Sequence, residues 1–494
     1  MINNITEILF KNAEKFPDKI AIIHKNKKIN YGGLAADVKD YACYFLEKGL
    51  KKGDNVLIFV PMSIELYKIL CSIFHIGATA VFIDAWADRK RLQDALSIVH
   101  CKAFIGCAKA FVLKLLSSKV AAINLNFMTG FNKFKPKTSA IAGLPNNISG
   151  EDTALITFTT GSTGKPKAAK RTHDFLLNQH YILKKHMEPK QDDIDLTTLP
   201  IFVLNNLACG TTSVIPDFNP AKPANINPQK ISAEIKKYKI NTSAGSPKFY
   251  EKLTQSKEQV NLERIFTGGA PVFPKLAKKL EDFFKNTKIE ILYGSTEAEP
   301  ISSISSSELL NYDTSPNSGL LVGNPSDINL KIIKYVNEPV KDFESLWLKN
   351  GETGEICVEG KHVLKEYYNS DEAQNFAKIK YKGQIWHRTG DAGYLDEQGR
   401  LFLMGRAKNK FEHNGKEYYV FPFENLLLEN ESIEIGTILK HNDKICIVAE
   451  LKGGFKDTKI DNIPYDRMIF LKKIPRDPRH NSKIDYDKLK SMLP

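Results

Sequence analysis

The sequence lacks the cysteine patterns that define several common structural classes. Its seven cysteines are odd in number, and no two of them form a Cys-x-x-Cys pair. A disulfide framework usually uses an even set of cysteines, and a structural zinc site usually uses closely spaced pairs. The cysteines therefore argue against both kinds of site, and they favour a protein of a reducing compartment.

Long apolar runs are missing as well. The most apolar stretch, residues 71–83, carries His75 and is much shorter than the roughly 20 apolar residues of a membrane helix. The first residues, MINNITEILFKNAEKF, show no basic start, apolar core or small-residue cleavage site of a signal peptide. We expect a cytoplasmic protein with no transmembrane segment.

The positive charge of the chain is not concentrated anywhere. Lys and Arg number 70 against 57 Asp and Glu, which gives a formal net charge of +13, yet the lysines stand in short pairs such as Lys184-Lys185. Dispersed lysines typically mark solvated helix faces, so we expect no nucleic-acid partner. The positive balance would still attract a small polyanionic substrate.

Length and patterning indicate a large α/β protein. A chain of 494 residues with 42% hydrophobic residues can bury more than one core. From residue 34 to residue 83, amphipathic segments alternate with short apolar runs such as NVLIFVPM. Short strands separated by helices of this kind predict parallel-rich sheets with flanking helices.

A change in composition predicts a domain boundary near residue 405. Closely spaced turns appear around residues 386–406, where the sequence TGDAGYLDEQGRLFLMGR reads as a hairpin. We expect an N-terminal domain at 1–404, a hinge at 405–408 and a small, mobile α+β domain at 409–494.

The segment TFTTGSTGKPKAAKRTH, residues 157–173, has the composition of a phosphate-binding loop. Glycines let backbone amides approach a polyphosphate, hydroxyl groups donate hydrogen bonds, and lysine supplies charge. The spacing differs from that of a Walker loop, because Pro166 follows Lys165. The predicted loop residues are Thr159, Thr160, Gly161, Ser162, Thr163, Gly164 and Lys167.

Together with later segments, this loop resembles the adenylate-forming superfamily of acyl-CoA synthetases, luciferases and peptide-synthetase adenylation domains. The family's other motifs follow in order as TGGAP (267–271), YGSTEAEP (293–300), HRTGD (387–391) and GRAKNK (405–410), with a late Lys483. The resemblance implies a large AMP-binding domain with a mobile C-terminal lid. It also implies ATP and Mg²⁺ as cofactors, and an acyl-adenylate and pyrophosphate as the first products.

The resemblance implies a role for each motif residue. Tyr293 offers a flat face for adenine, Thr296 can donate to the α-phosphate, and Glu297 can bind Mg²⁺ as a hard oxygen ligand. Asp391 can accept both ribose hydroxyls, and Arg406 can donate to ribose or phosphate oxygens. The adenine and ribose site would also include Gly269, Ala270 and Gly294.

Two lysines are implied in the C-terminal part. Lys483 matches the family's adenylation lysine, which stabilises the charged transition state. The family usually has Gly before it, whereas Ser482 stands here, and Lys488 and Lys490 lie close by. Lys408 falls at the family's hinge position, although a solvated lysine fits the sequence nearly as well.

The second reaction is indicated by four segments, at 103–111, 200–224, 245–253 and 474–490. They resemble the β-lactone synthetases of bacterial long-chain olefin biosynthesis. That resemblance implies a fatty or 3-hydroxy fatty acid whose own hydroxyl displaces AMP. Coenzyme A or a carrier-protein thiol is the alternative acceptor, and partner enzymes of a lipid pathway are expected. An acyl pocket, or equally well an ordinary core, is predicted at Phe202, Leu204 and Leu207.

A non-catalytic nucleotide-binding protein with the same fold is the alternative from another class. The chain keeps a complete set of charged motif residues, which a protein without catalysis has no physical need to keep. These residues are Lys167, Glu297, Asp391, Arg406 and Lys483. We therefore expect an enzyme whose substrate is a small-molecule carboxylic acid.

Overall fold

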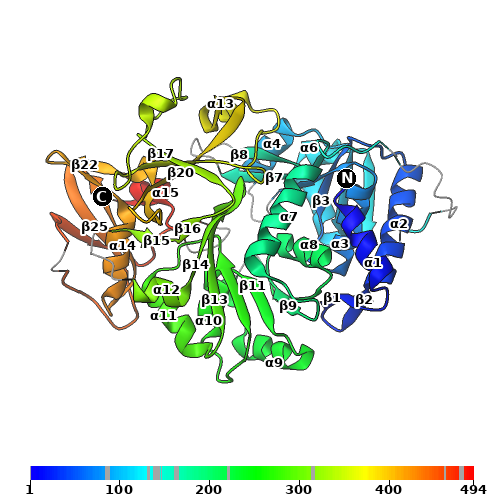
Figure 1. The fold of residues 1–494 in the computed structure, drawn as a ribbon, viewed down its shortest axis with the longest axis horizontal. Helices are drawn as coiled ribbons and strands as arrows, with labels where there is room; N and C mark the ends of the chain where they lie inside the picture. The colour runs from blue at the N-terminus through cyan, green and yellow to red at the C-terminus, as the bar shows by residue number, and fades with distance from the viewer. Residues whose placement is uncertain are drawn as a thin grey trace.

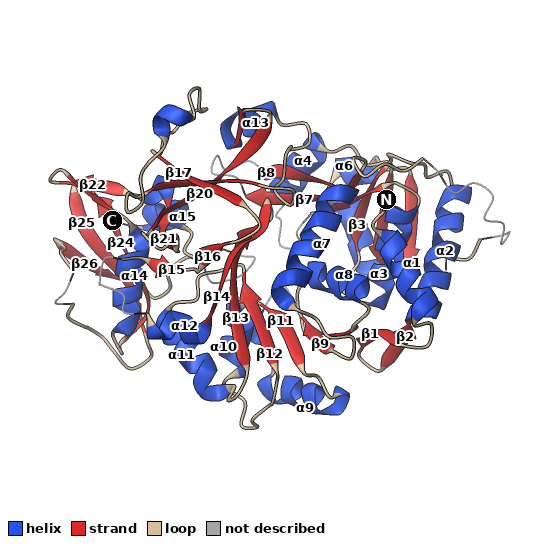
Figure 2. Cartoon of the chain, in the orientation of Figure 1, coloured by secondary structure: helices blue, strands red, loops and turns tan. Residues whose placement is uncertain are grey.

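The structure is a computed structural model of the chain, shown in Figure 1. It describes residues 2–83, 89–130, 134–136, 145, 147–160, 166–219, 223–312, 318–460, 463–477 and 483–493. Two parallel-rich sheets and an antiparallel sheet form the larger part, and residues 411–493 form the part at the other end (Figures 1 and 2).

The largest sheet has nine strands, and its six central strands run parallel to one another. An antiparallel strand pairs with this group on each side, as β2 with β1 and β14 with β13. In sheet order its strands are β16 (Asn324–Pro325), β14 (Ala298–Ser305), β13 (Lys288–Ser295), β12 (Arg264–Gly268), β11 (Thr242–Gly245), β9 (Ile194–Thr197), β10 (Thr212–Ile215), β1 (Ile20–His24) and β2 (Lys27–Asn30).

A second sheet of six strands is parallel except for its last pair, in which β7 and β8 form a hairpin. Its order is β6 (Leu125–Thr129), β5 (Ala103–Cys107), β3 (Asn55–Phe59), β4 (Thr79–Phe82), β7 (Thr153–Thr160) and β8 (Pro166–Thr172).

The remaining sheets are smaller. An antiparallel sheet contains β15 (Leu320–Leu321), β21 (Leu401–Arg406), β20 (Gln384–Leu395), β18 (Gly354–Glu359), β17 (Asn329–Ile333) and, paired with β20, β19 (Lys378–Tyr381). The C-terminal part contains β22 (Phe411–His413) with β23 (Lys416–Tyr418), and a sheet of β24 (Ile433–His441), β25 (Lys444–Leu451) and β26 (Arg467–Phe470).

Helices cover both parallel-rich sheets, and α7 and α8 lie between these two sheets (Figure 2). The longer helices are α1 (Thr6–Lys15), α2 (Tyr31–Glu47), α3 (Ile64–His75), α4 (Arg89–Ile98), α7 (His173–Met187), α8 (Pro200–Cys209), α9 (Pro228–Tyr238), α11 (Pro274–Phe283) and α14 (Val420–Glu429). The shorter ones are α5 (Leu113–Leu116), α6 (Ser118–Ala121), α10 (Pro247–Leu253), α12 (Ser306–Asn311), α13 (Asp371–Ala377) and α15 (Tyr486–Met492), with 3₁₀ turns at η1 (Ala108–Val112), η2 (Pro223–Asn225), η3 (Glu344–Leu346) and η4 (Ala407–Asn409).

Local chemistry sets the helix ends. The Ser63 and Thr172 side chains accept the backbone N–H of Leu66 and Phe175, which caps α3 and α7. Proline begins α8, where it loses no hydrogen bond, and Gly210 ends that helix with φ +76°. These signals can be read from the sequence.

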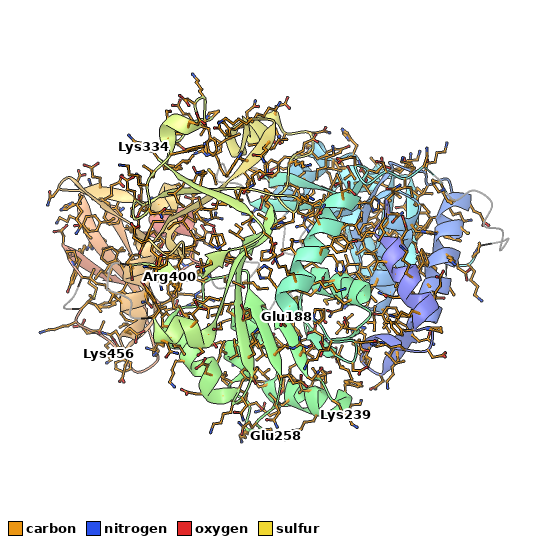
Figure 3. The ribbon with its side chains drawn as sticks, viewed as in Figure 1. Glu188, Lys239, Glu258, Lys334, Arg400 and Lys456 are labelled. Carbon is orange, nitrogen blue, oxygen red and sulfur yellow. The ribbon has the colours of Figure 1, made fainter. Side chains whose placement is uncertain are left out.

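The α/β prediction with parallel-rich sheets is confirmed. No helix of the described residues is long and apolar enough to cross a membrane. Charged side chains such as Lys239, Lys334 and Lys456 lie at the margin of the molecule, as expected for dispersed lysines (Figure 3).

Candidate functional site

Several predicted site residues lie where the central strands of the nine-stranded sheet end. Strand β12 ends at Gly268 and is followed directly by Gly269 and Ala270. The neighbouring parallel strand β13 contains Tyr293 and Gly294. Ligands of open α/β sheets bind beyond the carboxyl ends of the strands, which is where these residues lie.

Glu297 follows β13 and is held by side chains from two other parts of the chain. The Thr159 hydroxyl donates to Glu297 Oε1 at 3.1 Å, and the Tyr367 hydroxyl donates to the same oxygen at 3.0 Å. The side chain is 9% exposed. Among the described residues, none donates a hydrogen bond to Oε2, which leaves one carboxylate oxygen available to a ligand.

The charge state of Glu297 depends on buried cations. Burial alone would raise its pKa, but His387, Lys378 and the two hydroxyl donors together lower the pKa to about 2. Burial first, and then Lys378, lower the pKa of His387 to about 3. His387 is therefore neutral at pH 7, and Lys378 and the hydroxyl donors keep Glu297 ionised.

Lys378 is the buried cation beside this carboxylate. It is the first residue of β19, its ammonium donates to the Leu364 carbonyl, and it lies 5.3 Å from the centre of the Tyr367 ring. Burial lowers its pKa to about 7, against the opposing effect of Glu297. A lysine as buried as this one, without a carboxylate nearby, would lose its proton and its charge.

The segment 363–368 brings these groups together. Val363 forms a β-bridge with Ala298, and the Leu364 N–H donates to the Glu297 carbonyl at 2.7 Å. Further along, Tyr367 forms a β-bridge with Ala169 of β8. The segment therefore connects the nine-stranded sheet to the six-stranded sheet, with Glu297 at the junction.

A second cluster joins Tyr293, Asp391 and Arg406. The Tyr293 hydroxyl donates to Asp391 Oδ2 at 2.9 Å, and Arg406 Nη1 lies 3.1 Å from Asp391 Oδ1. Asp391 and Arg406 are register partners in β20 and β21, so the hairpin itself sets their separation. The structure thus brings together three residues that the sequence assigned to one nucleotide site.

A buried ion pair supports the turn before Asp391. Arg388 Nη2 lies 2.7 Å from Glu355 Oε2, with both side chains only 1% exposed. The other oxygen of Glu355 accepts the Gly390 N–H at 3.2 Å. Neither Arg388 nor Glu355 was predicted from the sequence, although Arg388 stands inside HRTGD.

Two glycines allow backbone conformations at this site that other residues would not. Gly269 has φ +81°, a conformation that L side chains rarely adopt. At Gly294 a Cβ atom would meet the Ala298 carbonyl oxygen at 2.8 Å, so only glycine fits the backbone turn there. Ala270 and Thr296 are partly exposed beside them.

The phosphate loop lies mostly outside the described residues. This holds for Gly161, Ser162, Thr163 and Gly164, while Thr160 ends β7. Lys167 follows in β8, paired in register with Thr159. Its side chain is 8% exposed, its ammonium lies 5.7 Å from the centre of the Tyr367 ring, and burial lowers its pKa. Lys167 therefore belongs to the cluster around Glu297.

The two C-terminal lysines have different surroundings. Lys408 lies in η4, and its ammonium is 3.1 Å from Asp487 Oδ2 of α15. Lys483 is exposed, and its backbone exchanges two hydrogen bonds of 2.8 Å with Asp477, one to the carboxylate and one from the backbone N–H. The roles of these lysines in a hinge and in adenylation stay predictions.

The predicted acyl residues point to two different places. Phe202 packs with Ala244, Phe266 and Leu292 beside the nucleotide residues. Leu204 and Leu207, from the other face of α8, contact the first helices of the chain. Residues that are close in sequence can lie on different faces of a helix, because a helix has about 3.6 residues per turn. Of the three, Phe202 is the one placed near the site.

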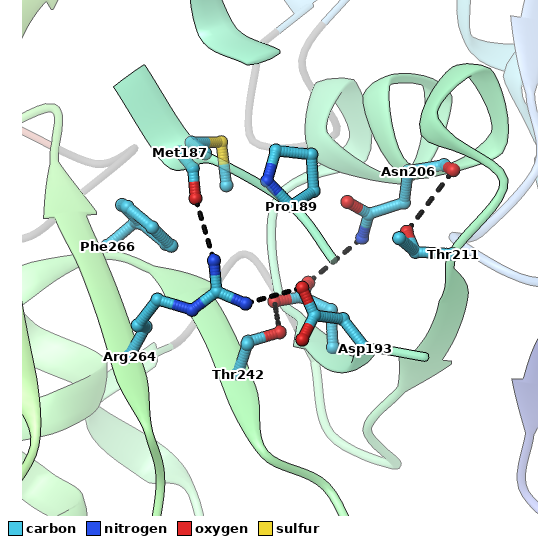
Figure 4. A pocket seen from close by; sticks show the side chains of 9 residues that line it. Met187, Pro189, Asp193, Asn206, Thr211, Thr242, Arg264 and Phe266 are labelled. Carbon is cyan, nitrogen blue, oxygen red and sulfur yellow. Dashed lines mark hydrogen bonds and ion pairs between the residues drawn. The ribbon is translucent and has the colours of Figure 1, made fainter. Parts of the chain in front are cut away.

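A polar cavity also opens at the amino ends of β9, β11 and β12 (Figure 4). The Asp195 carboxylate there accepts hydrogen bonds from Asn206 (3.0 Å) and Thr242 (3.0 Å), and Arg264 pairs with Asp193 at 2.5 Å. Most of these polar groups pair with one another, while Arg264 Nε is buried without a hydrogen-bond partner among the described residues. Glu297 follows the carboxyl end of β13, whereas this cavity lies at the amino ends of its neighbouring strands. The cavity is therefore separate from the nucleotide residues.

Sequence reasoning missed Tyr367, Lys378 and His387. Tyr367 lies 70 residues from Glu297 along the chain. His387 stands in HRTGD, so its motif was visible, but no local pattern marks Lys378 as a buried residue. A lysine between apolar residues in FAKIKY is the one weak signal.

Comparison with known proteins supplies a family. The sequence model described as "AMP-binding enzyme" matches residues 9–368. The olefin beta-lactone synthetase of Stenotrophomonas maltophilia is 28% identical, covering 98% of this chain and 97% of its own. That of Xanthomonas campestris is 26% identical over 98% and 96%. The structure of O-succinylbenzoate coenzyme A synthetase from Bacillus subtilis, solved with AMP, superposes with a TM-score of 0.80 at 18% identity, covering 100% of this chain and 98% of that one.

Proposed function

The chain belongs to the AMP-binding enzyme family and is an adenylate-forming ligase, and from that premise we propose which reaction it catalyses. The enzyme activates a fatty or 3-hydroxy fatty acid with ATP, releasing pyrophosphate. The acyl-adenylate then closes to a β-lactone and releases AMP.

The observation that supports the first step is the pair of clusters around Asp391 and Glu297. The Asp391 carboxylate is already oriented by Tyr293 and Arg406, so it can accept ribose hydroxyls without rearrangement.

Glu297 fits a role as a magnesium ligand. Its carboxylate is ionised at neutral pH, and both hydrogen bonds go to Oε1, so Oε2 can coordinate a hard cation. When bound, Mg²⁺ would neutralise charge on the phosphate oxygens. The ammonium groups of Lys167 and Lys378 lie at the same place and add positive charge when they are protonated.

The residues of the chain would have separate roles in adenylation. Lys483 would neutralise the charge that develops when the substrate carboxylate attacks the α-phosphorus. Thr296 would donate to an α-phosphate oxygen. Phe202 and its buried neighbours Ala244, Phe266 and Leu292 are apolar, so contact with an alkyl chain would suit them better than contact with a charged group.

The β-lactone step is supported by the near-full-length similarity to olefin beta-lactone synthetases. The 3-hydroxyl oxygen attacks the acyl carbon, and a new carbon–oxygen bond closes the four-membered ring. The bond from the acyl carbon to the phosphate oxygen breaks, AMP leaves with that electron pair, and the hydroxyl proton passes to solvent. Intramolecular attack offers a high effective molarity that offsets ring strain.

The deciding experiment compares two acids of equal length in buffer without coenzyme A. With the 3-hydroxy acid we expect AMP release over many turnovers and a lactone in the mass spectrum. With the acid that lacks the hydroxyl we expect no turnover, or one equivalent of bound adenylate.

Addition of coenzyme A is the control. If both acids turned over only with coenzyme A or a carrier thiol present, the lactone proposal would be wrong and adenylation would stand. If neither acid released pyrophosphate, the choice of acid would be wrong.

A further inference from the structure

One part of the described surface exposes an unusual amount of apolar side chain. Of the ten large hydrophobic residues that are exposed in the described part of the chain, four lie within residues 112–128. They are Val112 (51% exposed), Leu115 (86%), Leu116 (51%) and Met128 (39%). Single exposed apolar residues are normal on soluble proteins, whereas a cluster usually marks a contact surface. We call these four residues the 112–128 patch.

The four residues share one face of the molecule. Lys114 of α5 donates to the Ile123 carbonyl at 3.0 Å and to Asn126 Oδ1 at 2.8 Å, which ties α5 to β6. Side chains two residues apart on a strand point to the same side, so Met128 lies on the side of β6 that faces α5 with Asn126. In the part of the chain that the structure describes, β6 is the edge strand of its sheet, and the patch lies beside it.

The core does not require these outward residues. Phe111 and Leu113 from the same segment already pack against the buried cluster of the six-stranded sheet, with Phe111 and Phe104 ring centres 5.0 Å apart. Val112, Leu115 and Leu116 lie between and after them in the segment and are exposed. The segment therefore carries apolar side chains on its outer side as well as toward the core.

The surroundings of the patch are positively charged. From residue 95 to residue 150 the sequence contains no Asp or Glu. Within the described part of the chain, no carboxylate pairs with Lys102, Lys109, Lys114 or Lys119, and Lys119 donates to the Ser97 hydroxyl. Uncompensated lysines around apolar side chains match a surface with anionic headgroups over hydrocarbon.

We infer that the 112–128 patch docks the enzyme reversibly on an anionic lipid surface. Leu115 and Leu116 would enter the headgroup and acyl boundary, while Lys109 and Lys119 would contact lipid phosphates. A second copy of this chain would bring the same lysines to the contact, and like charges oppose such pairing. This inference does not depend on which acid the enzyme activates.

Sedimentation with lipid vesicles tests the inference. We expect binding to vesicles that contain phosphatidylglycerol, little binding to pure phosphatidylcholine, and a loss of binding as salt is raised. Leu115→Glu with Leu116→Glu should weaken binding at least about tenfold. Lys109→Gln and Lys119→Gln should each weaken it roughly fivefold.

Matched controls lie in the C-terminal part. Phe455 is 50% exposed, so Phe455→Glu makes the same kind of change outside the patch, and Lys472→Gln and Lys473→Gln, as separate variants, each remove one positive charge there. These controls should bind vesicles like the wild type. All variants should keep the wild-type melting temperature and the rate of pyrophosphate release without lipid.

Three outcomes would overturn the inference. These are no vesicle binding by the wild type, equal binding to both vesicle types, and equal loss of binding in patch and control variants. Sedimentation velocity tests the alternative explanation, that the patch joins two copies of the chain. If the wild type formed a dimer and did not bind vesicles, and the double variant Leu115→Glu with Leu116→Glu were a monomer, the patch would be a contact between two copies of the chain.

Discussion

At the scale of single residues, Glu297 has the clearest chemistry in the candidate site. Two hydroxyl donors fix one of its oxygens, and His387, Lys378 and these donors together lower its pKa to about 2 despite burial. The carboxylate is therefore ionised at neutral pH. Its charge, more than its shape, should matter for metal binding.

Glu297→Gln should raise the Mg²⁺ concentration for half-maximal activity at least roughly tenfold. Glutamine keeps the oxygen that accepts from Tyr367 and Thr159, but it removes the negative charge that a divalent cation needs. The measurement is pyrophosphate release over a magnesium titration. Glu366→Gln is the control, since Glu366 pairs with Lys170 at the surface, 56% exposed. An unchanged magnesium dependence in Glu297→Gln would make Glu297 structural.

Lys483→Ala should lower the rate of pyrophosphate release on the order of a hundred- to a thousandfold. The lysine is expected to act on the charged transition state, so ATP affinity should stay within a few-fold of the wild type. Lys488→Ala and Lys490→Ala test the alignment and should be close to normal. A near-normal rate for Lys483→Ala, with a slow Lys488→Ala or Lys490→Ala, would move the role to that neighbour.

At the scale of elements, α14, β24 and α15 meet around a buried carboxylic acid. Thr437 Oγ1 of β24 donates to Glu424 Oε1 of α14 at 3.0 Å, and the Tyr486 hydroxyl of α15 donates to the same oxygen. Burial raises the pKa of Glu424 to about 7, in spite of both donors. The contact links the helix that carries Asp487 to the rest of the C-terminal part.

This raised pKa predicts a pH-dependent stability. Between about pH 4.5 and pH 7 the unfolded chain has lost the Glu424 proton and the folded protein still holds it. The unfolded state therefore binds fewer protons, so the free energy of unfolding falls as pH rises through this window. The full contribution is present below about pH 4.5, and the loss is roughly 3 kcal/mol.

Glu424→Gln should remove this slope, because glutamine does not titrate and keeps an oxygen for Thr437 and Tyr486. The measurement is urea unfolding of wild type and variant at pH 5 and pH 8. We expect the variant to gain stability relative to the wild type as pH rises. Parallel curves at the two pH values would contradict the raised pKa.

At the scale of the whole molecule, the connection between the two ends passes through η4. Lys408 lies there, and its ion pair with Asp487 is exposed, with side-chain exposures of 34% and 80%. An exposed pair of this kind contributes at most about 1 kcal/mol, so it would not hold the C-terminal part in one orientation. This geometry suits a hinge, which the sequence also predicts.

Lys408→Pro should slow one half-reaction more than the other, so that the ratio of their rates changes at least about tenfold. Proline fixes φ, and a hinge residue must change its backbone angles between the two poses. Pyrophosphate release reports the first half-reaction and AMP release the second. Lys408→Ala keeps backbone freedom and should leave the ratio unchanged. Equal slowing of both steps by proline would argue against a hinge at Lys408.

The sequence by itself determined the family, the α/β class and the motif residues, because these depend on local chemistry. Gly294, Asp391 and Arg406 were found because glycine, carboxylate and guanidinium stand in short, ordered motifs. The pairing of Asp391 with Arg406 is also nearly local, since one hairpin holds both.

Tertiary structure decided what surrounds each motif. Tyr367 and Lys378 reach Glu297 because the segment 363–368 crosses between two sheets, and no spacing within the sequence encodes that crossing. It also separated Phe202 from Leu204 and Leu207, and it left Leu115 exposed. Burial and charge states arise from contacts between distant segments. The sequence pattern can identify the reacting groups, but only the packing of the folded chain sets their pKa values and their partners.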